Sequence, residues 1–113
     1  MKVQQLEPKI SRRVQFSFKD RKLVPRTAGC YALTNFEGDV LYVGLSDDLY
    51  RRFAQHRDTD EKRTATAHGK AFWFYYLTCS SKDINRIERA WLNQHISVHG
   101  TFPILNKVSS PIR

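Results

Sequence analysis

Long hydrophobic runs are missing from this sequence of 113 residues. No stretch approaches the roughly 20 apolar residues that a membrane-spanning helix needs, so we expect no membrane segment. The N-terminal stretch MKVQQLEPKISRR has no apolar core of the signal-peptide kind, and we therefore expect a cytoplasmic protein. Internal repeats and low-complexity segments are missing too, and the length fits one domain.

Cysteine and acidic residues are both in short supply. Cys30 and Cys79 follow no metal-ligand spacing and sit in apolar, strand-like runs, so we interpret them as small core residues. Lysine and arginine number 19 against 11 acidic residues, which gives a formal charge of +8. The excess is concentrated in residues 1–27, which we interpret as a basic N-terminal extension to a domain at 28–113. A basic surface favours a polyanion such as nucleic acid, although solubility alone also explains it.

The sequence does contain short segments that are typical of a mixed α and β domain. Cys30–Thr34 and Val40–Gly44 are apolar and rich in strand formers, and the turn residues between them predict a β-hairpin. Ser46 then predicts the N-cap of a helix over Asp47–Arg57. Earlier in the chain, Val14–Phe18 is compatible with a further strand.

Two more elements follow a polar stretch at residues 58–70, which we expect to be an exposed loop. The aromatic run Ala71–Cys79 is best explained by a strand that is buried on both faces. Ser80–Asp83 has the pattern of a capping box for a helix over about Ser81–Val98, and Gly100 suits its C-cap. The order strand, strand, helix, strand, helix predicts an α+β fold with a small, mainly antiparallel, three-stranded sheet and flanking helices.

Glu88 breaks the pattern of this second helix. The apolar stripe of the helix follows i, i+3, i+4, i+7 spacing and consists of Ile84, Ile87, Trp91, His95 and Ile96. Glu88 falls inside the stripe when the helix is projected at about 100° per residue. Its carboxylate should therefore be partly buried, and a buried carboxylate needs a partner. A structural ion pair and a metal ligand both meet this requirement.

The first helix raises a similar question. Leu49 and Phe53 form its apolar stripe, and Arg52 and His56 flank that stripe on one side as i, i+4 neighbours. Arg52 could simply lay its stem over the core, and His56 could be a cation favoured by the helix dipole. The alternative is that the helix delivers both side chains together toward the sheet.

The two tyrosines of the hairpin share a face in only one register. If the strands are joined by an even number of residues, Tyr42 opposes Leu33 and lies diagonal to Tyr31 on the same face. An odd connection, such as Asn35–Asp39, would turn the two tyrosines to opposite faces. A shared site therefore requires the even register.

Five features in this order resemble the GIY-YIG nuclease family. They are GCY at residues 29–31, YVG at 42–44, Arg52 in the next helix, Glu88 in the second helix and Asn106 in a Pro-x-x-Asn tail. The resemblance covers about residues 25–107. Cys30 departs from the usual Ile or Val, and Leu45 stands where the nucleotide-excision-repair members carry a lysine. His56 stands where those members carry a tyrosine and some phage homing enzymes carry a histidine.

The resemblance implies a DNA phosphodiesterase that depends on Mg²⁺ or Mn²⁺. Glu88 would be the single protein ligand of the metal, which explains a carboxylate on an apolar face. Asp47 and Asp48 are candidates for a second ligand, with helix-dipole roles as the alternative. Arg52 would stabilise charge on the scissile phosphate, and His56 would assist proton transfer or bind phosphate.

The remaining family positions are two tyrosines and an asparagine. Tyr42 is our first choice for the group that activates the attacking water, and Tyr31 would position the phosphate or a base, although these roles could be exchanged. A nearby metal and arginine would favour the phenolate form. Asn106 would anchor the site through hydrogen bonds.

Three hypotheses for function follow from these observations. The first is a DNA endonuclease or nickase, the second a non-catalytic nucleic-acid-binding module that retains the fold, and the third a partner-binding domain with the 58–70 loop at its interface. Targeting to DNA could come from residues 1–27, from that loop, from a homodimer or from a separate protein. Candidate phosphate contacts are Lys19, Arg21, Lys22, Arg26, Lys62, Arg63 and Lys70.

Overall fold

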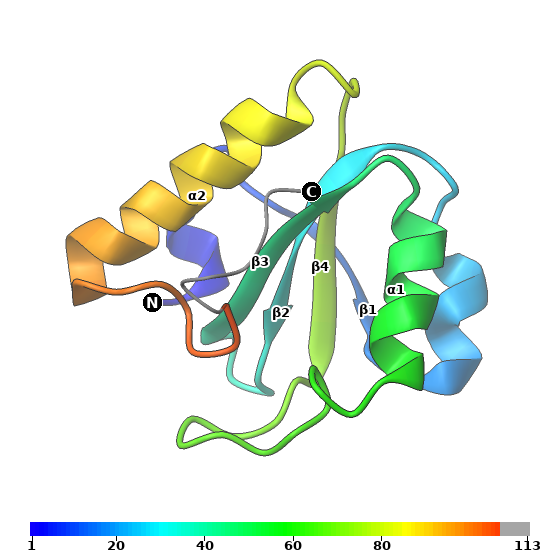
Figure 1. Cartoon of the computed structure of the whole chain (residues 1–113), viewed down its shortest axis with the longest axis horizontal. Coiled ribbons are helices and arrows are strands. Elements are labelled where there is room, and N and C mark those ends of the chain that lie inside the picture. Colours follow the sequence, from blue (N-terminus) through cyan, green and yellow to red (C-terminus); the bar gives the residue numbers. More distant parts are fainter. Residues whose placement is uncertain (107–113) are drawn as a thin grey trace.

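A four-stranded antiparallel sheet organises the computed structural model, which describes residues 1–106 (Figure 1). Its strands are β1 (Arg12–Gln15), β2 (Gly29–Thr34), β3 (Val40–Ser46) and β4 (Trp73–Thr78), in the order β1-β4-β2-β3. The α+β class is confirmed, with one strand more than the three predicted. The additional strand β1 overlaps the possible strand at Val14–Phe18 but begins at Arg12, because the short polar sequence RRVQ carries too little alternation to fix the bounds. The predicted domain end at residue 113 lies outside the described residues.

Helices cover both faces of this sheet. The α-helices are α1 (Leu49–Asp58) and α2 (Ile84–His99), and the 3₁₀ helices are η1 (Val3–Gln5) and η2 (Phe18–Leu23). In Figure 1, α2 lies over one face, whereas α1 and η2 lie together on the other. The predicted cap of α1 is wrong, because β3 continues through Ser46 and the helix begins later. Asp48 is the N-cap instead, and its carboxylate accepts a hydrogen bond from the Arg51 N–H.

The second helix also begins later than predicted. Ser80–Asp83 forms a turn in which the Asp83 N–H donates to the Ser80 carbonyl, and α2 starts at Ile84 without a side-chain cap. The Asp83 backbone is already helical, whereas a capping residue is normally extended. The predicted C-cap is confirmed: Gly100 has φ 76°, and its N–H donates to the Ile96 carbonyl.

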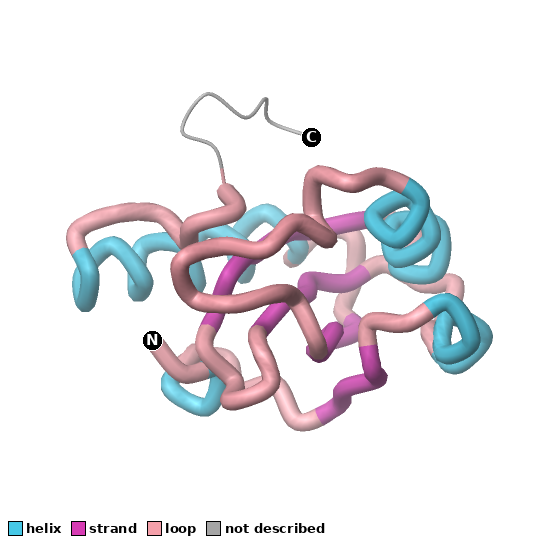
Figure 2. Tube along the Cα trace, turned by 90° about the horizontal axis from the view of Figure 1, so that it is seen from below, coloured by secondary structure: helices cyan, strands magenta, loops and turns pink. Residues whose placement is uncertain are grey.

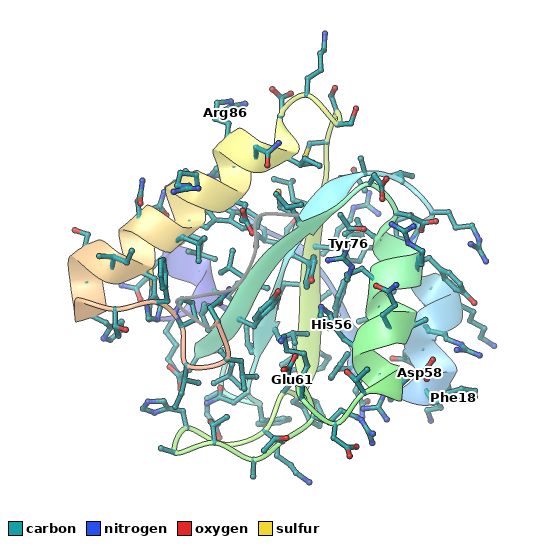
Figure 3. The ribbon with its side chains drawn as sticks, in the orientation of Figure 1. Phe18, His56, Asp58, Glu61, Tyr76 and Arg86 are labelled. Carbon is teal, nitrogen blue, oxygen red and sulfur yellow. The ribbon has the colours of Figure 1, made fainter. Side chains whose placement is uncertain are left out.

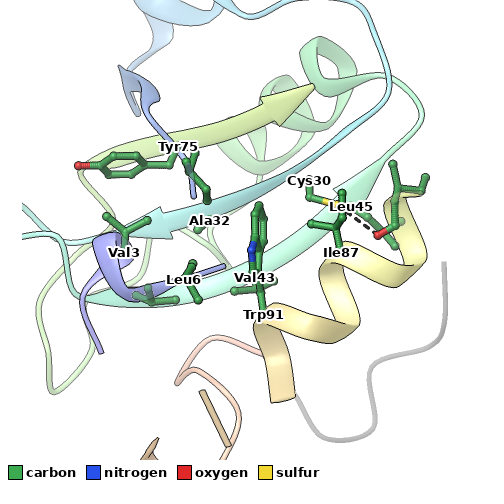
Figure 4. Close-up of a cluster of buried hydrophobic side chains, with 12 residues drawn as sticks. Val3, Leu6, Cys30, Ala32, Val43, Leu45, Tyr75, Ile87 and Trp91 are labelled. Atoms are coloured by element: carbon green, nitrogen blue, oxygen red, sulfur yellow. Dashed lines mark hydrogen bonds between the residues drawn. The ribbon is translucent and has the colours of Figure 1, made fainter. Parts of the chain in front are cut away.

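Alternation along the strands creates two hydrophobic cores. The core between α2 and the sheet contains Ala32, Val43 and Trp91 (Figure 4), whereas the core on the α1 face contains Leu33 and Phe53. Neighbouring residues of β4 enter opposite cores, which confirms that this aromatic strand is buried on both faces.

The cysteines belong to the first core. Cys30 is buried, Cys79 is half-buried, and both thiols are free. The Cys30 thiol donates a hydrogen bond to the carbonyl of Ile84 at the start of α2, shown as a dashed line in Figure 4. The interpretation of the cysteines as core residues therefore agrees with the structure.

The basic segment 1–27 is packed into the same two cores. Its buried apolar residues are Val3, Leu6, Ile10, Val14, Phe16 and Val24. The carbonyl of Pro8 also accepts a hydrogen bond from the indole N–H of Trp91 at 3.0 Å. Val3, Leu6 and Ile10 have a helical spacing and Val14 and Phe16 a strand spacing, but each run is too short to predict its element beside the charged neighbours.

Segments from both ends of the described chain cover the outer edge of β3. The Val40 N–H donates to the Met1 carbonyl at 2.9 Å, and the Leu105 N–H donates to the Leu41 carbonyl at 2.8 Å. Asn106 continues this pairing at Val43. Covering an edge strand in this way prevents it from pairing with another chain. Figure 2 shows these loop segments beside the strands.

The helices are short in relation to a bilayer. Within residues 1–106, no helix is both long enough and apolar enough to cross a membrane.

Candidate active site

The hairpin register places both tyrosines on the face covered by α1. Tyr42 pairs with Leu33 and Tyr31 pairs with Gly44, as the even register requires, and the two phenol rings are 5.9 Å apart. The register is reached by an unexpected route. Thr34 pairs with Val40, so the loop between the strands has an odd number of residues. A β-bulge next to this pair then shifts the register by one residue, and Leu33 pairs with Tyr42.

Gly44 leaves the space that the Tyr31 phenol occupies. A Cβ atom at this position would lie 2.5 Å from the Tyr31 hydroxyl oxygen and 2.6 Å from its Cζ. The third residue of the YVG triplet therefore has to be glycine for the Tyr31 ring to lie across β3. Phe74 of β4 stacks on the other side of this ring, with centroids 4.9 Å apart and planes inclined by 14°. Phe74 was not singled out from the sequence, although the alternation of β4 could have placed it on this face.

Tyr31 and His56 form a close polar pair inside this core. The Tyr31 hydroxyl oxygen lies 2.6 Å from His56 Nε2, and both side chains are buried. The His56 ring also meets the Tyr42 ring edge-on, with centroids 5.5 Å apart. Figure 3 shows His56 pointing from α1 toward the sheet. Of the two alternatives for His56, the structure therefore agrees with a side chain directed from α1 toward the sheet. His56 is not an exposed cation at the end of the helix.

Burial keeps both members of this pair neutral. It raises the pKa of Tyr31 well above its ordinary value; Tyr42 adds to this effect, and Arg52 opposes it. The pKa of His56 is lowered to about 3, mainly by burial and in smaller part by the positive charges of Lys62 and Arg52. At neutral pH the pair is therefore a phenol beside an uncharged imidazole, which can share a proton without either group being ionised.

Arg52 brings a positive charge to the same cluster. Its guanidinium is half-buried and affects the pKa values of both Tyr31 and His56. One Nη1–H donates to the Leu45 carbonyl at 3.4 Å, and Nε is buried without a hydrogen-bond partner among residues 1–106. A buried N–H without a partner is costly, and a bound anion is one group that would satisfy it.

Lys62 is the residue of this site that the sequence placed wrongly. It lies in the predicted exposed loop at 58–70, yet only 7% of its surface is exposed. Its ammonium lies 4.6 Å from the centroid of the Tyr42 ring and 3.1 Å from the Glu61 carboxylate. Most of the other residues of the loop are exposed. The polar composition of the loop therefore could not predict that one of its lysines is buried. Leu45, at the position where repair members carry a lysine, lies in the opposite core.

Glu88 lies on α2, across the sheet from the tyrosine cluster. It is 4% exposed, which confirms that a carboxylate is buried within the apolar stripe; Ile96, also assigned to that stripe, is 37% exposed instead. Glu88 lies close enough to Cys30 to contribute to its raised pKa, of which burial is the main cause. The two faces of the sheet meet along the edge strand β3, against which α2 packs. That Glu88 lies within reach of the tyrosines stays a prediction.

The structure contains no ready-made cage of metal ligands. Residues 1–106 hold no group of three or more His, Cys, Asp or Glu side chains that could share an ion. The two acids considered as second ligands are used locally: Asp47 pairs with Arg51 at 2.6 Å, and Asp48 caps α1. This leaves Glu88 as the predicted ligand with a buried carboxylate.

Asn106 acts on the backbone of the strand that carries Tyr42. Its Oδ1 accepts a hydrogen bond from the Val43 N–H and its Nδ2 donates to the Val43 carbonyl, both at 2.9 Å. The side-chain amide therefore imitates a neighbouring strand at one residue of the free edge. The geometry matches an anchoring role, one residue away from Tyr42.

The remaining candidate phosphate contacts divide between two regions. Lys19, Arg21 and Lys22 lie in η2 beside α1, and Arg26 lies shortly after it, with its guanidinium 4.0 Å from the centroid of the Tyr50 ring. Arg63 and Lys70 lie in the loop after α1, where Arg63 is partly exposed and Lys70 is exposed. The helix η2 packs beside α1, and the loop begins where α1 ends.

Comparison with known proteins agrees with this geometry. Residues 27–101 match the GIY-YIG catalytic domain family. The chain is 30% identical over 79 residues to the UvrABC system protein C of Methanosarcina acetivorans, and 28% identical over 79 residues to that of Methanosarcina barkeri. Each match covers 67% of this chain but only 15% of the relative's length.

A match across most of the folded chain defines the family. This protein belongs to the GIY-YIG nuclease family, and the resemblance read from GCY, YVG, Arg52, Glu88 and Asn106 is confirmed.

Proposed function

We propose that this chain is a DNA endonuclease, or a nickase, that depends on a divalent metal. The observation that carries the proposal is the Arg52 guanidinium, whose buried Nε lacks a partner among residues 1–106 beside the Tyr31–His56 pair. A phosphate oxygen supplies the anionic acceptor that such a group needs. Two relatives with the name UvrABC system protein C add support, although the chain spans only a small part of each.

In this proposal, the neutral side chains of Tyr31 and His56 orient the reacting groups, and the Arg52 guanidinium stabilises negative charge. Tyr31, held in its phenol form by burial, shares a hydrogen bond with His56 Nε2 and helps to orient His56 or the phosphate. With its pKa lowered to about 3, His56 is too weak a base to take the proton of the attacking water, so we assign it to orient the Tyr31 phenol. Arg52 offsets the negative charge that develops on the phosphate.

Tyr42 remains our first choice for the group that activates water. Its ring is 8% exposed, whereas the Tyr31 ring is fully buried, so Tyr42 is the more accessible to a water molecule. The Lys62 ammonium lies 4.6 Å from the centroid of the Tyr42 ring and so brings a positive charge next to this side chain. Asn106 holds the β3 backbone next to Tyr42 and so acts as a positioning residue.

The donor available for a metal is a hard carboxylate oxygen, which suits Mg²⁺ or Mn²⁺. These ions retain several waters and are often bound by one or two carboxylates together with substrate phosphate, so Glu88 alone is a sufficient protein ligand. When bound, the ion would act as a Lewis acid toward the phosphate and lower the pKa of water. We assign Glu88 to hold it.

Several candidate DNA contacts lie in or after η2, which packs beside α1, and the others lie in the loop that follows α1. Lys19, Lys22, Arg26 and Lys70 are exposed, and Arg21 and Arg63 partly so. We infer that they hold the DNA backbone without reading its sequence, because long cationic side chains act on phosphates. Sequence or structure specificity would then come from a homodimer or from a separate targeting protein.

Plasmid relaxation tests this proposal. Supercoiled DNA incubated with the purified chain and Mg²⁺ or Mn²⁺ should give open-circular product, and EDTA should stop the reaction. Glu88→Gln should abolish nicking with little loss of DNA binding. The exposed acid Glu37 provides the matched control, since Glu37→Gln removes the same charge away from the site.

Two results would contradict the proposal. One is a wild-type protein that binds DNA and nicks it under no metal or salt condition, which would favour the non-catalytic binding module. The other is equal nicking by the Glu88→Gln and Glu37→Gln variants.

A further inference from the structure

The turn after α1 holds Lys62 inside the site while its neighbours face solvent. Arg63 Nε donates to the Thr59 carbonyl at 3.0 Å, the Arg63 N–H donates to the Asp60 carbonyl at 3.1 Å, and the Thr64 hydroxyl donates to that same carbonyl at 2.6 Å. The side chains of Asp60 and Glu61 are 96% and 56% exposed, whereas that of Lys62 is 9% exposed. The inward position of Lys62 is therefore fixed by a hydrogen-bonded turn.

An ammonium group in this place needs an explanation. Removing a charge from water is unfavourable, and lysine is seldom buried without a reason. The Tyr42 ring offsets part of this penalty as a cation–π partner, and Glu61 pairs with the ammonium from its half-exposed position. An arrangement that served only to attach the loop would reach the same packing with an apolar side chain and no charge.

The positive charge of Lys62 is felt at the centre of the site. After burial itself, Lys62 is the largest cause of the lowered pKa of His56, followed by Arg52, whereas Glu61 opposes them less strongly. In Figure 3, Glu61 lies beside His56. The cluster of Tyr31, Tyr42 and His56 is thus in a net positive field, which is the field that a phosphodiester requires.

We propose that Lys62 is a functional member of this site, in which its ammonium acts with the Arg52 guanidinium to hold and neutralise the scissile phosphate beside Tyr42. The proposal rests on the proposed nuclease function. It adds a second protein cation, delivered by the loop between α1 and β4. Because the ammonium is a compact point charge with three donors, it can exchange its contact with Glu61 for a phosphate oxygen.

Lys62→Met tests the role of the charge, since methionine keeps most of the apolar stem. Turnover at saturating plasmid should fall roughly 10²-fold, the usual effect of losing one group that stabilises developing charge. The concentration of plasmid giving half-maximal rate should change far less. Lys62→Arg should recover a large part of the rate. Lys82→Met, which removes an exposed lysine before α2, is the matched control and should nick at the wild-type rate.

A second measurement needs no activity and separates this proposal from the proposed function. The groups facing His56 are Tyr31 from β2, Tyr42 from β3, Arg52 from α1, and Glu61 and Lys62 from the loop. Removing the Lys62 charge should raise the pKa of His56, so its imidazole should titrate at higher pH by NMR. Lys82→Met should leave the titration unchanged.

The outcomes are distinct. An unchanged His56 titration in Lys62→Met would overturn the proposal whether or not the protein nicks DNA. Wild-type turnover in that variant, with the fold intact by circular dichroism, would overturn it as well. A wild-type protein that never nicks DNA would instead count against the proposed function, and the titration would still decide whether Lys62 belongs to the site.

Discussion

At the scale of single residues, the site depends on two groups kept neutral by burial. Tyr31 and His56 would each titrate within reach of ordinary pH ranges in water. Inside the protein their pKa values move apart, upward for the phenol and downward for the imidazole. The two groups share a hydrogen bond of 2.6 Å, and neither changes its protonation state near neutral pH.

The lowered pKa of His56 predicts a loss of stability in acid. The unfolded chain takes up a proton near pH 6.5, whereas the folded site takes it up only near pH 3, so stability falls as pH decreases between these values. Urea unfolding at pH 7, 5 and 4 should show this fall, and His56→Gln should reduce it by roughly a few kcal/mol. His68→Gln, at an exposed histidine, should leave the slope unchanged. Parallel curves for wild type and His56→Gln would contradict the assignment.

At the scale of elements, the edge strand β3 is the part that joins the site together. It carries Tyr42 and Gly44, it lies between the α1 face and the helix of Glu88, and it is covered outside by residues from both ends of the described chain. The bulge near Leu41 sets which face each side chain takes. A small displacement of β3 would therefore change several catalytic distances together.

Asn106→Ala should weaken this strand locally. The variant leaves the Val43 N–H and carbonyl without their side-chain partners, at a cost of about 1–3 kcal/mol. Amide exchange at Val43 should accelerate much more than at Ala32 in the central strand β2, and plasmid nicking should slow. Asn93→Ala, at an exposed position of α2, is the matched control. Uniform acceleration at both amides would point to global destabilisation and against a local anchor.

Much of this arrangement could be predicted from the sequence, for identifiable reasons. Strong periodicity gave the hairpin, the two α-helices and the buried position of Glu88, because a carboxylate inside an apolar stripe is conspicuous. The strand β1 was placed two residues too late, at Val14–Phe18, and was left out of the predicted sheet. The inward turn of Lys62 was missed, because this polar segment is ordered by tertiary contacts. The bulge was missed as well, since counting loop residues assumes that pairing begins regularly at the loop.

At the scale of the whole molecule, part of the positive charge lies beside the site. The basic helix η2 packs beside α1, which carries Arg52 and His56, and the 58–70 loop adds further cations. The segment 1–27 is therefore both a structural part of the sheet and a source of surface charge. This dual role explains why its composition indicated an extension while its apolar residues are buried.

Charge removal near η2 should change how DNA binding responds to salt. Replacing Lys19, Lys22 and Arg26 by Gln should reduce the slope of log affinity against log salt by about 0.9 for each phosphate that the protein no longer neutralises. Fluorescence anisotropy with a labelled duplex in EDTA measures this without cleavage. The control triple Lys82→Gln, Arg86→Gln and Arg89→Gln removes equal charge around α2, where all three side chains are exposed. Equal slope changes in the two triples would locate the DNA elsewhere.

The cover on β3 also has a consequence for how the protein is made. Tyr42 is synthesised early, but the backbone next to it gains its Asn106 partner only after the last described residues have left the ribosome. Because synthesis proceeds from the N-terminus, a nascent chain can form the hairpin while the outer edge of β3 at Val43 is still open. The backbone next to Tyr42 is thus fixed only after Asn106 has emerged.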